Sequence, residues 1–454
     1  MMDFATARLA IALLLLFTSF STAQDAPDRP DAGKAGENRG AASEPPQDGK
    51  QLDLPAVPEF DTSEPVVARM EMKLTLDKQV IDTIQKGDLL TVLAVREKSL
   101  VIQTFNGFKG AVAKTNAAKL AESVAIYDDL IAETPEDGRR YTLRASAHWA
   151  TGDAVKALAD FDKAIELGYD EAHAFASRGL FHAASGNYEA AIADYTTAIE
   201  KDPKDDVPLM NRASVYMATG KYELAIEDYT SAIELKPENP VLYSQRAVAL
   251  KLLNKPNEAI EDYSRTLKLV ENDVSALMGR GFLKFQLGEH AAAIDDFGRV
   301  VKLAPENALA LNNRGYNYQL LKKFDLALAD YRRATELAPG YLLALQNLAW
   351  LLTTCENKDL RDAAVAIEIA KKVCEITEFK NLSDLTLLAA AHAEAGEFET
   401  AIGWQEKVIE LASDEQKLAF GKILALYQDK QPLDLKLLEV EEPETPPAKA
   451  SEEK

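Results

Sequence analysis

The sequence predicts a mainly α-helical protein, an α-α superhelical solenoid of paired helices that follows a small β-barrel. Two observations lead to this prediction. A pattern of small and aromatic residues recurs every 34 residues between 138 and 341, and each half of the repeat has the apolar spacing of an α-helix. Before the repeats, residues 63–114 alternate apolar and polar side chains between glycines, which is typical of short β-strands.

The composition argues against some classes of function before any motif is considered. The chain has 454 residues, with 73 acidic against 51 basic side chains and a formal net charge of −22. Such a surface repels phosphate backbones, so we expect no nucleic-acid partner and favour a cationic or mixed-charge partner.

Residues 1–23 are predicted to be a secretory signal peptide. Arg8 precedes an apolar run that ends at Phe17, and small residues then lead to Ala23, where we expect cleavage. The run has about a dozen residues, short of the roughly 20 needed to span a bilayer, so no membrane-spanning segment is expected in the mature chain. The protein is therefore predicted to be exported, either to a periplasm or out of the cell.

Two segments lack the apolar residues needed for a core. Residues 24–62 have almost no large apolar side chain before Leu52 and are predicted to be a disordered linker. Residues 433–454 combine glutamates with prolines and are predicted to be an acidic disordered tail.

Residues 63–114 form the predicted β domain. The segments Lys86–Val92 and Gly107–Val112 resemble the central strands of a bacterial SH3-like domain, and this resemblance implies a binding or spacer module. Proline-rich ligands of SH3 domains bind in grooves lined by aromatic side chains. Only Phe105 and Phe108 are available here, so we do not expect recognition of such ligands.

Six consecutive repeats fill residues 138–341. Each repeat has a small residue in its first half, an alanine 12 residues later and an aromatic residue four residues after that. The small residues are Ala145, Gly179, Ala213, Ala247, Gly281 and Gly315, and the aromatic residues are Phe161, Tyr195, Tyr229, Tyr263, Phe297 and Tyr331. The alanine and the aromatic residue share one face of a helix, because they stand at i and i+4.

A tight turn separates the two predicted helices of each repeat. It is marked by Gly152, Gly186, Gly220, Asn254 and Gly288, with Lys322 as the exception in the sixth repeat. One such hairpin cannot bury its apolar face alone, so neighbouring hairpins must stack. The period, the small residues, the aromatic residue and the proline after four of the second helices resemble the tetratricopeptide repeat (TPR) family. The resemblance implies a solenoid that binds proteins or peptides on a concave surface lined by the first helices.

The helical array is predicted to extend beyond these six repeats. Upstream, residues 115–137 are expected to form a half-repeat helix with Tyr127 at a buried position. Downstream, residues 342–413 are expected to form two less regular repeats, and residues 414–430 a helix that covers the exposed end of the core.

An arginine precedes the small residue in all six repeats, and an aspartate precedes the aromatic residue. The pairs are Arg144 and Asp160, Arg178 and Asp194, Arg212 and Asp228, Arg246 and Asp262, Arg280 and Asp296, and Arg314 and Asp330. The turn lies midway between the two positions, so antiparallel helices bring them level. We therefore expect six partly buried ion pairs within the repeats, with a row of anion-binding arginines as the alternative.

The predicted concave surface becomes more apolar toward the C-terminal half. The predicted peptide-binding groove consists of Val248, Met278, Phe282, Phe285, Asn312, Tyr316, Gln319, Gln346 and Trp350. Its apolar side chains would anchor a peptide, and its three amides would bond the peptide backbone. The alternative is that the aromatic residues pack against neighbouring first helices.

The sequence offers no set of residues for catalysis, cofactor binding or metal binding. The five histidines are scattered, and neither a phosphate-binding loop ending in Lys-Ser or Lys-Thr nor a Gly-x-Ser-x-Gly motif is present. We therefore expect a protein that is not an enzyme and has no cofactor. Cys355 and Cys374 are expected on different helices about 18 Å apart, too far for a disulfide.

These observations predict an exported scaffold that binds a peptide or protein segment in the TPR groove. The alternative is an envelope or cell-wall attachment protein that binds through its SH3-like domain and uses the repeats as a rigid arm. Self-association through the apolar groove is a third alternative.

Overall fold

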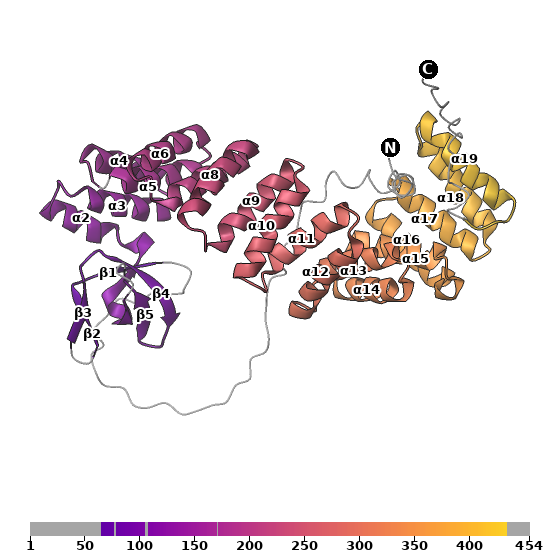
Figure 1. Cartoon of the computed structure of the whole chain (residues 1–454), viewed down its shortest axis with the longest axis horizontal. Coiled ribbons are helices and arrows are strands. Elements are labelled where there is room, and N and C mark those ends of the chain that lie inside the picture. Colours follow the sequence, from indigo (N-terminus) through magenta and orange to yellow (C-terminus); the bar gives the residue numbers. More distant parts are fainter. Residues whose placement is uncertain (1–64, 77–78, 105–107, 170, 434–454) are drawn as a thin grey trace, which may run out of the picture. The chain divides into compact units, whose positions relative to one another are not determined.

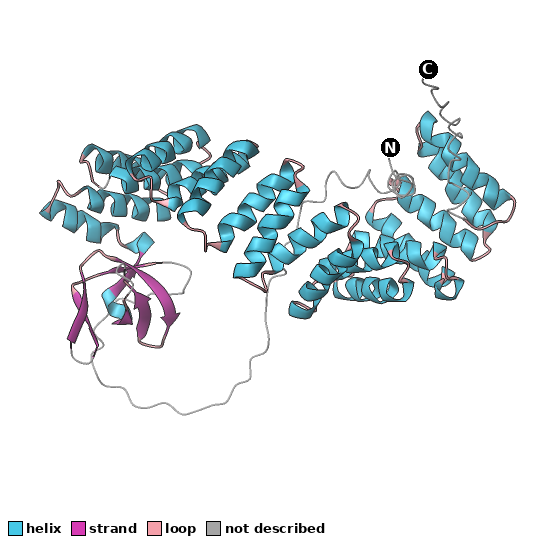
Figure 2. Cartoon of the chain, viewed as in Figure 1, coloured by secondary structure: helices cyan, strands magenta, loops and turns pink. Residues whose placement is uncertain are grey.

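The computed structural model describes residues 65–76, 79–104, 108–169 and 171–433 (Figure 1). It divides into two compact units, which are considered separately: the N-terminal unit ends at Leu269 and the C-terminal unit begins at Val270. The predicted signal peptide, the predicted linker and the tail from residue 434 onward lie outside the described residues. Figure 2 shows that strands are confined to the start of the described chain and that helices make up the rest.

The N-terminal unit begins with a small β domain. Five strands form an antiparallel sheet in the order β6-β5-β4-β1-β7, and β2 and β3 form a separate hairpin. The strands are β1 (Val66–Ala68), β2 (Met72–Leu76), β3 (Gln79–Ile84), β4 (Leu89–Val95), β5 (Ser99–Gln103), β6 (Lys109–Ala113) and β7 (Ala117–Lys119). Alternate residues of β4 and β5, among them Leu90, Val92, Leu100 and Ile102, face one core. The prediction of a small β domain is confirmed.

The prediction that residues 115–137 form a single helix is wrong in its first part. Ala117–Lys119 form β7, which pairs with β1, and Leu120–Glu122 form a short 3-10 helix, η3. Helix α2 spans only Val124–Glu133. Alanine favours helices, but here Ala117 and Ala118 are fully buried in the sheet, and tertiary packing outweighs local propensity.

The β domain and the first helices share one apolar cluster. Val67 of β1 packs with Tyr127 and Leu130 of α2. The Tyr127 hydroxyl donates a hydrogen bond of 3.1 Å to the carbonyl of Gly87, in the turn between β3 and β4. The β domain therefore covers the N-terminal end of the helical stack, as the end of a solenoid core requires.

Four helical hairpins complete the N-terminal unit. Their helices are α3 (Gly138–Ala150) with α4 (Ala154–Glu166), α5 (Glu171–Ala184) with α6 (Tyr188–Lys201), α7 (Asp206–Ala218) with α8 (Tyr222–Leu235), and α9 (Pro240–Leu252) with α10 (Pro256–Leu269). Aspartate or asparagine side chains cap several first helices; Asp137, for example, accepts from the backbone N–H of Arg139. Gly152, with φ of +82°, makes the turn of the first hairpin.

Each glycine at the small position lies against the aromatic residue of its own hairpin. A Cβ placed on Gly179 would lie 2.9 Å from Cε1 of Tyr195, and one placed on Gly315 would lie 2.9 Å from Cε1 of Tyr331. Where alanine takes the small position, as at Ala145 and Ala213, it is fully buried. The small residue is thus needed for the close approach of the two helices that the sequence pattern predicts.

The C-terminal unit continues with hairpins of the same kind. Its helices are α11 (Val274–Gln286), α12 (His290–Leu303), α13 (Ala308–Leu320), α14 (Phe324–Leu337), α15 (Leu342–Thr354), α16 (Ala363–Ile376), α17 (Leu382–Glu394), α18 (Phe398–Leu411) and α19 (Asp414–Gln428). Lys322 takes the positive φ, +56°, that glycine supplies in most other hairpins. The extra residues between α15 and α16 form a short 3-10 helix, η4 (Lys358–Leu360).

The C-terminal end of this unit is densely packed. All residues of α17 from Ser383 to Ala393 are buried, and α19 covers them with Phe420 and Tyr427 in one apolar cluster. Cys355 and Cys374 are both buried and free. Burial raises the pKa of the Cys374 thiol to about 12, so this cysteine is an unreactive core residue. Among the described residues, no helix is both long enough and apolar enough to cross a membrane.

Candidate interaction surface

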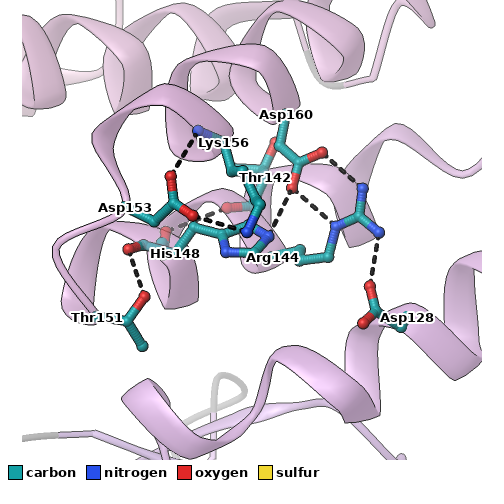
Figure 3. Close-up of polar contacts among 9 residues, drawn as sticks. Asp128, Thr142, Arg144, His148, Thr151, Asp153, Lys156 and Asp160 are labelled. Carbon is teal, nitrogen blue, oxygen red and sulfur yellow. Dashed lines mark hydrogen bonds and ion pairs between the residues drawn. The ribbon is translucent and has the colours of Figure 1, made fainter.

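The structure brings together all six arginine–aspartate pairs that the sequence predicts. In each pair Nε and Nη2 of the arginine donate to the two carboxylate oxygens of the aspartate, so the contact is bidentate. For Arg144 and Asp160 these distances are 2.8 and 2.7 Å (Figure 3). The other five pairs have the same two contacts, at 2.6 to 2.9 Å. Each pair joins the first and second helix of one hairpin.

These ion pairs are largely removed from solvent. The Asp194 side chain is 7% exposed and its partner Arg178 is 21% exposed. The hydrogen bond from Arg178 to Asp194 is the main cause that raises the pKa of Arg178 above its ordinary value, so the arginine stays charged. Paired in this way, the arginines serve the fold and are poor candidates for binding a separate anion.

In the N-terminal unit the same arginines also reach the preceding hairpin. Nη1 of Arg144 donates to Asp128 of α2 at 2.7 Å, as Figure 3 shows. Nη1 of Arg178 donates to Asp162, Nη1 of Arg212 to Thr196 and Nη1 of Arg246 to Thr230, at 2.7, 2.8 and 3.0 Å. Each acceptor stands two residues after the position of the paired aspartate in the previous repeat. This second contact was not predicted, although the recurrence of Asp, Asp, Thr and Thr at one position is visible in the sequence.

In some hairpins a second basic side chain, four residues after the arginine, lies near the paired aspartate. Lys284, four residues after Arg280, places Nζ 2.8 Å from Oδ2 of Asp296. His148 takes this position in the first hairpin, with Nε2 3.8 Å from Oδ2 of Asp160. Asp296 therefore accepts from a lysine as well as from its arginine, and Asp160 has a histidine nearby.

The predicted groove residues divide between the two units. Val248 lies on α9 of the N-terminal unit. The other eight lie in the C-terminal unit, on α11, α13 and α15, and only these are treated below as one surface.

Three aromatic residues of α11 and α13 form a cluster, which we call the aromatic surface. The ring of Phe285 lies 6.1 Å from that of Phe282 and 5.6 Å from that of Tyr316, the latter edge to face. All three rings are partly exposed. The rings therefore pack across neighbouring first helices, as the alternative interpretation expected, and still present apolar area to solvent.

Two of the predicted backbone-binding amides do not fit that role. Asn312 and Gln346 are only 1% and 5% exposed. The Asn312 oxygen accepts from Asn347 at 2.9 Å, and the Gln346 amide nitrogen donates to Asp384 at 2.6 Å. Both amides therefore satisfy buried neighbours, and the prediction that they would bind a peptide backbone is wrong.

Gln319 differs from these two amides. It is partly exposed, and its Oε1 accepts from the Tyr331 hydroxyl at 2.9 Å, which leaves its N–H groups for another acceptor. Met278 and Trp350 are also partly exposed.

The first helices of this surface carry no unpaired charge. Arg280 and Lys284 of α11 both contact Asp296, Arg314 of α13 contacts Asp330, and α15 contains no charged residue. An apolar or uncharged segment therefore suits this surface better than a charged one. Among the described residues, no group of three or more histidine, cysteine, aspartate or glutamate side chains has the arrangement of a metal site.

The chain contains tetratricopeptide repeats. Models of this repeat match residues 142–206, 213–254, 274–307 and 308–341, which confirms the resemblance seen in the sequence. The family consists typically of non-enzymatic scaffolds for protein–protein interaction. No curated protein matches the chain.

Several solved structures resemble parts of the chain. YrrB, described as a TPR protein with an unusual peptide-binding site, is 26% identical over 41% of this chain and 95% of its own, with a TM-score of 0.38. The C-terminal part of a TPR repeat-containing protein from Cytophaga hutchinsonii is 18% identical over 50% of this chain and 94% of its own, with a TM-score of 0.46. PilF of Pseudomonas aeruginosa is 20% identical over 46% of this chain and 96% of its own, with a TM-score of 0.39.

Proposed function

We propose that this protein is an exported scaffold that binds a peptide or protein segment on the aromatic surface of α11 and α13. The matches to TPR models support the scaffold class. The observation that carries the specific proposal is the cluster of Phe282, Phe285 and Tyr316, which is partly exposed and has no unpaired charge on its helices.

The chemistry of the surface indicates the kind of ligand. Aromatic side chains are enriched at protein interfaces, and tyrosine and tryptophan are among the residues that contribute most binding energy there. Here Met278 and Trp350 extend the apolar area, and the free N–H groups of Gln319 can donate to a peptide carbonyl. A segment with two or three apolar anchors and few charges fits this arrangement.

Substitution of the aromatic surface tests the proposal. A peptide library is selected against the full mature chain, and the affinity of the selected peptides is measured for Phe282→Ala, Tyr316→Ala and the double variant. We expect each single variant to lose about tenfold or more in affinity, because a central interface aromatic contributes more than about 1.4 kcal/mol. Phe108→Ala, which removes an exposed aromatic of the β domain, is the matched control. Unchanged affinity in the double variant would exclude this surface.

The alternative, attachment through the β domain, has one supporting observation. Leu93 and Val95 of β4 and Phe108 beside β6 are exposed large apolar side chains. Deleting residues 24–114 is a poor test, because it would also uncover Tyr127 and Leu130 of α2. A Leu93→Ser/Val95→Ser variant changes only these two exposed side chains and leaves the buried residues of the sheet in place. If this variant is lost from the envelope while Phe282→Ala/Tyr316→Ala stays there, the attachment role replaces the peptide-binding role.

Export is tested separately. The full chain is expressed in a bacterium, the cell fractions are separated and the N-terminus of the mature protein is sequenced. We expect a periplasmic or secreted protein that begins at Gln24. A cytosolic protein that keeps residues 1–23 would contradict the predicted signal peptide.

A further inference from the structure

Helix α3 of the N-terminal unit borders an open hollow in the surface, called the cavity below, that no part of the proposed function uses. It has a volume of about 300 Å³ and is lined by Leu120 of η3 and by Ser146, Trp149 and Ala150 of α3. The Trp149 ring is held edge to face against Phe181, at 5.6 Å. This volume is at the low end of ligand pockets, roughly 300–1,000 Å³, and is suited to one large apolar side chain.

The strand register places the start of the described chain close to this cavity. β1 and β7 are antiparallel, and Val66 lies opposite Lys119. Leu120 follows Lys119 directly and lines the cavity. The chain that precedes Val66 therefore leaves the sheet at the end where the cavity begins.

The sequence of that preceding segment matches the cavity. Between residues 24 and 64 the only large apolar side chains are Leu52, Leu54, Val57 and Phe60, and Phe60 is the only aromatic residue. Phe60 is five residues before Pro65, a stretch that reaches up to about 17 Å when extended.

Charges next to the cavity favour the same segment. The ammonium group of Lys119 makes no hydrogen bond or ion pair with another residue in the described part of the chain. Phe60 is flanked by Glu59 and Asp61. A docked Phe60 would bring these two carboxylates toward a lysine that has no other partner there.

We propose that Phe60 inserts into the cavity beside Trp149, so that a segment of the chain itself occupies this part of the α3 surface. The segment covers an apolar cavity that the helical stack and the β domain leave open. This inference concerns the N-terminal unit alone and does not depend on the aromatic surface of α11 and α13.

Photo-cross-linking tests the proposal in the full mature chain. p-Benzoylphenylalanine replaces Phe60, and in a control chain it replaces Phe108. After irradiation at low protein concentration, we expect the residue at position 60 to cross-link within one molecule to the peptides that contain Leu120 or residues 146–150. The control should not react there. Cross-links only to other regions, or only between two molecules, would overturn the proposal; the second result would indicate a second copy as the occupant.

Amide hydrogen exchange gives a second test, which does not require p-benzoylphenylalanine in place of Phe60. In the wild-type chain, amides of residues 52–64 should exchange several-fold more slowly than in Trp149→Ala, and Phe60→Ser should show the same loss of protection. Phe108→Ala should leave the exchange unchanged. Equal exchange in the wild type, Trp149→Ala and Phe60→Ser would show that the segment does not dock.

Discussion

Gly298 lies beside Arg314 at the position where other repeats hold a hydrogen-bond acceptor. A Cβ placed on Gly298 would lie 3.9 Å from Nη1 of Arg314. In the N-terminal unit the corresponding residue accepts from the arginine of the next hairpin, as Thr230 does from Arg246 at 3.0 Å. Within the described residues, Nη1 of Arg314 has no such acceptor.

A serine at position 298 should therefore add a contact between two hairpins. Gly298→Ala alone should stabilise α12 by about 0.5–1 kcal/mol, because glycine is unfavourable inside a helix. Helix propensity alone would leave Gly298→Ser about 0.5 kcal/mol less stable than Gly298→Ala. We expect Gly298→Ser to equal or exceed Gly298→Ala in urea unfolding, since its hydroxyl accepts from Arg314, a gain of about 1 kcal/mol. If the free energy of unfolding of Gly298→Ser is lower than that of Gly298→Ala by about 0.5 kcal/mol, the difference in helix propensity explains the result and the contact with Arg314 does not form.

The two acceptors of one arginine should differ in their contribution to stability. Asp194, which is buried, and Asp162, whose side chain is 55% exposed, both bind Arg178. Asp194→Asn should lower the free energy of unfolding by about 2 kcal/mol, because a buried charge-assisted pair loses one partner. Asp162→Asn, the control, should cost less than about 1 kcal/mol, as exposed ion pairs do. Similar losses for both variants, measured by urea unfolding, would mean that burial does not govern these pairs.

The 34-residue period was enough to predict the paired helices and the contact between Arg144 and Asp160. Both residues belong to one hairpin, and because the turn lies midway between them in the sequence, they lie opposite each other on the two antiparallel helices. The contact between Arg144 and Asp128 could not be predicted in the same way, because it depends on how far one hairpin rotates on the next.

Burial at the C-terminal end was harder to predict. Gln346 faces Asp384, which follows an insertion that interrupts the period, so the repeat pattern does not predict which residues of the two helices lie opposite each other. The β7 strand was missed because Ala117 and Ala118 favour a helix locally, and only pairing with β1 makes them a strand.

Gly87 should be required for the contact between the β domain and α2. Its φ is +88°, and a Cβ placed there would lie 2.6 Å from Cδ1 of Leu130. Gly87→Ala should destabilise the N-terminal unit by about 2–3 kcal/mol, through backbone strain and the displaced leucine together. Gly152→Ala is the control, since Gly152 has a φ of +82° and nothing within 4 Å of an added Cβ. If both variants lose the same stability in thermal unfolding, backbone strain alone explains the effect and the contact with Leu130 is not tight.

Asp384 should make the stability of the C-terminal unit depend on pH. It is 1% exposed, its Oδ2 has no hydrogen-bond partner among the described residues, and burial raises its pKa above the ordinary value. A raised folded-state pKa means that the carboxyl group's contribution to stability is complete below the unfolded pKa of about 3.9 and is lost as the pH rises through the folded pKa.

Asp384→Asn removes that titration and keeps an oxygen for Gln346. The difference in urea midpoint between Asp384→Asn and the wild type should therefore grow in favour of the variant as the pH rises from 4 to 8. Asp153→Asn, which changes an exposed helix cap, serves as the control and should not show this trend. If the difference in urea midpoint stays constant with pH, burial does not raise the pKa of Asp384.

Two buried tyrosines should differ in how their stability contribution changes when the hydroxyl group is removed. Both Tyr427 and Tyr127 are fully buried, but the Tyr427 hydroxyl has no hydrogen-bond partner among the described residues, whereas the Tyr127 hydroxyl donates to Gly87. Tyr127→Phe should lose about 1 kcal/mol, because the Gly87 carbonyl loses its donor. Tyr427→Phe should be neutral or gain up to about 1 kcal/mol, because an unpaired polar group leaves the core. Thermal unfolding of the two variants measures both changes, and a loss in Tyr427→Phe equal to that in Tyr127→Phe would show that the Tyr427 hydroxyl has a partner in solution, such as a buried water molecule.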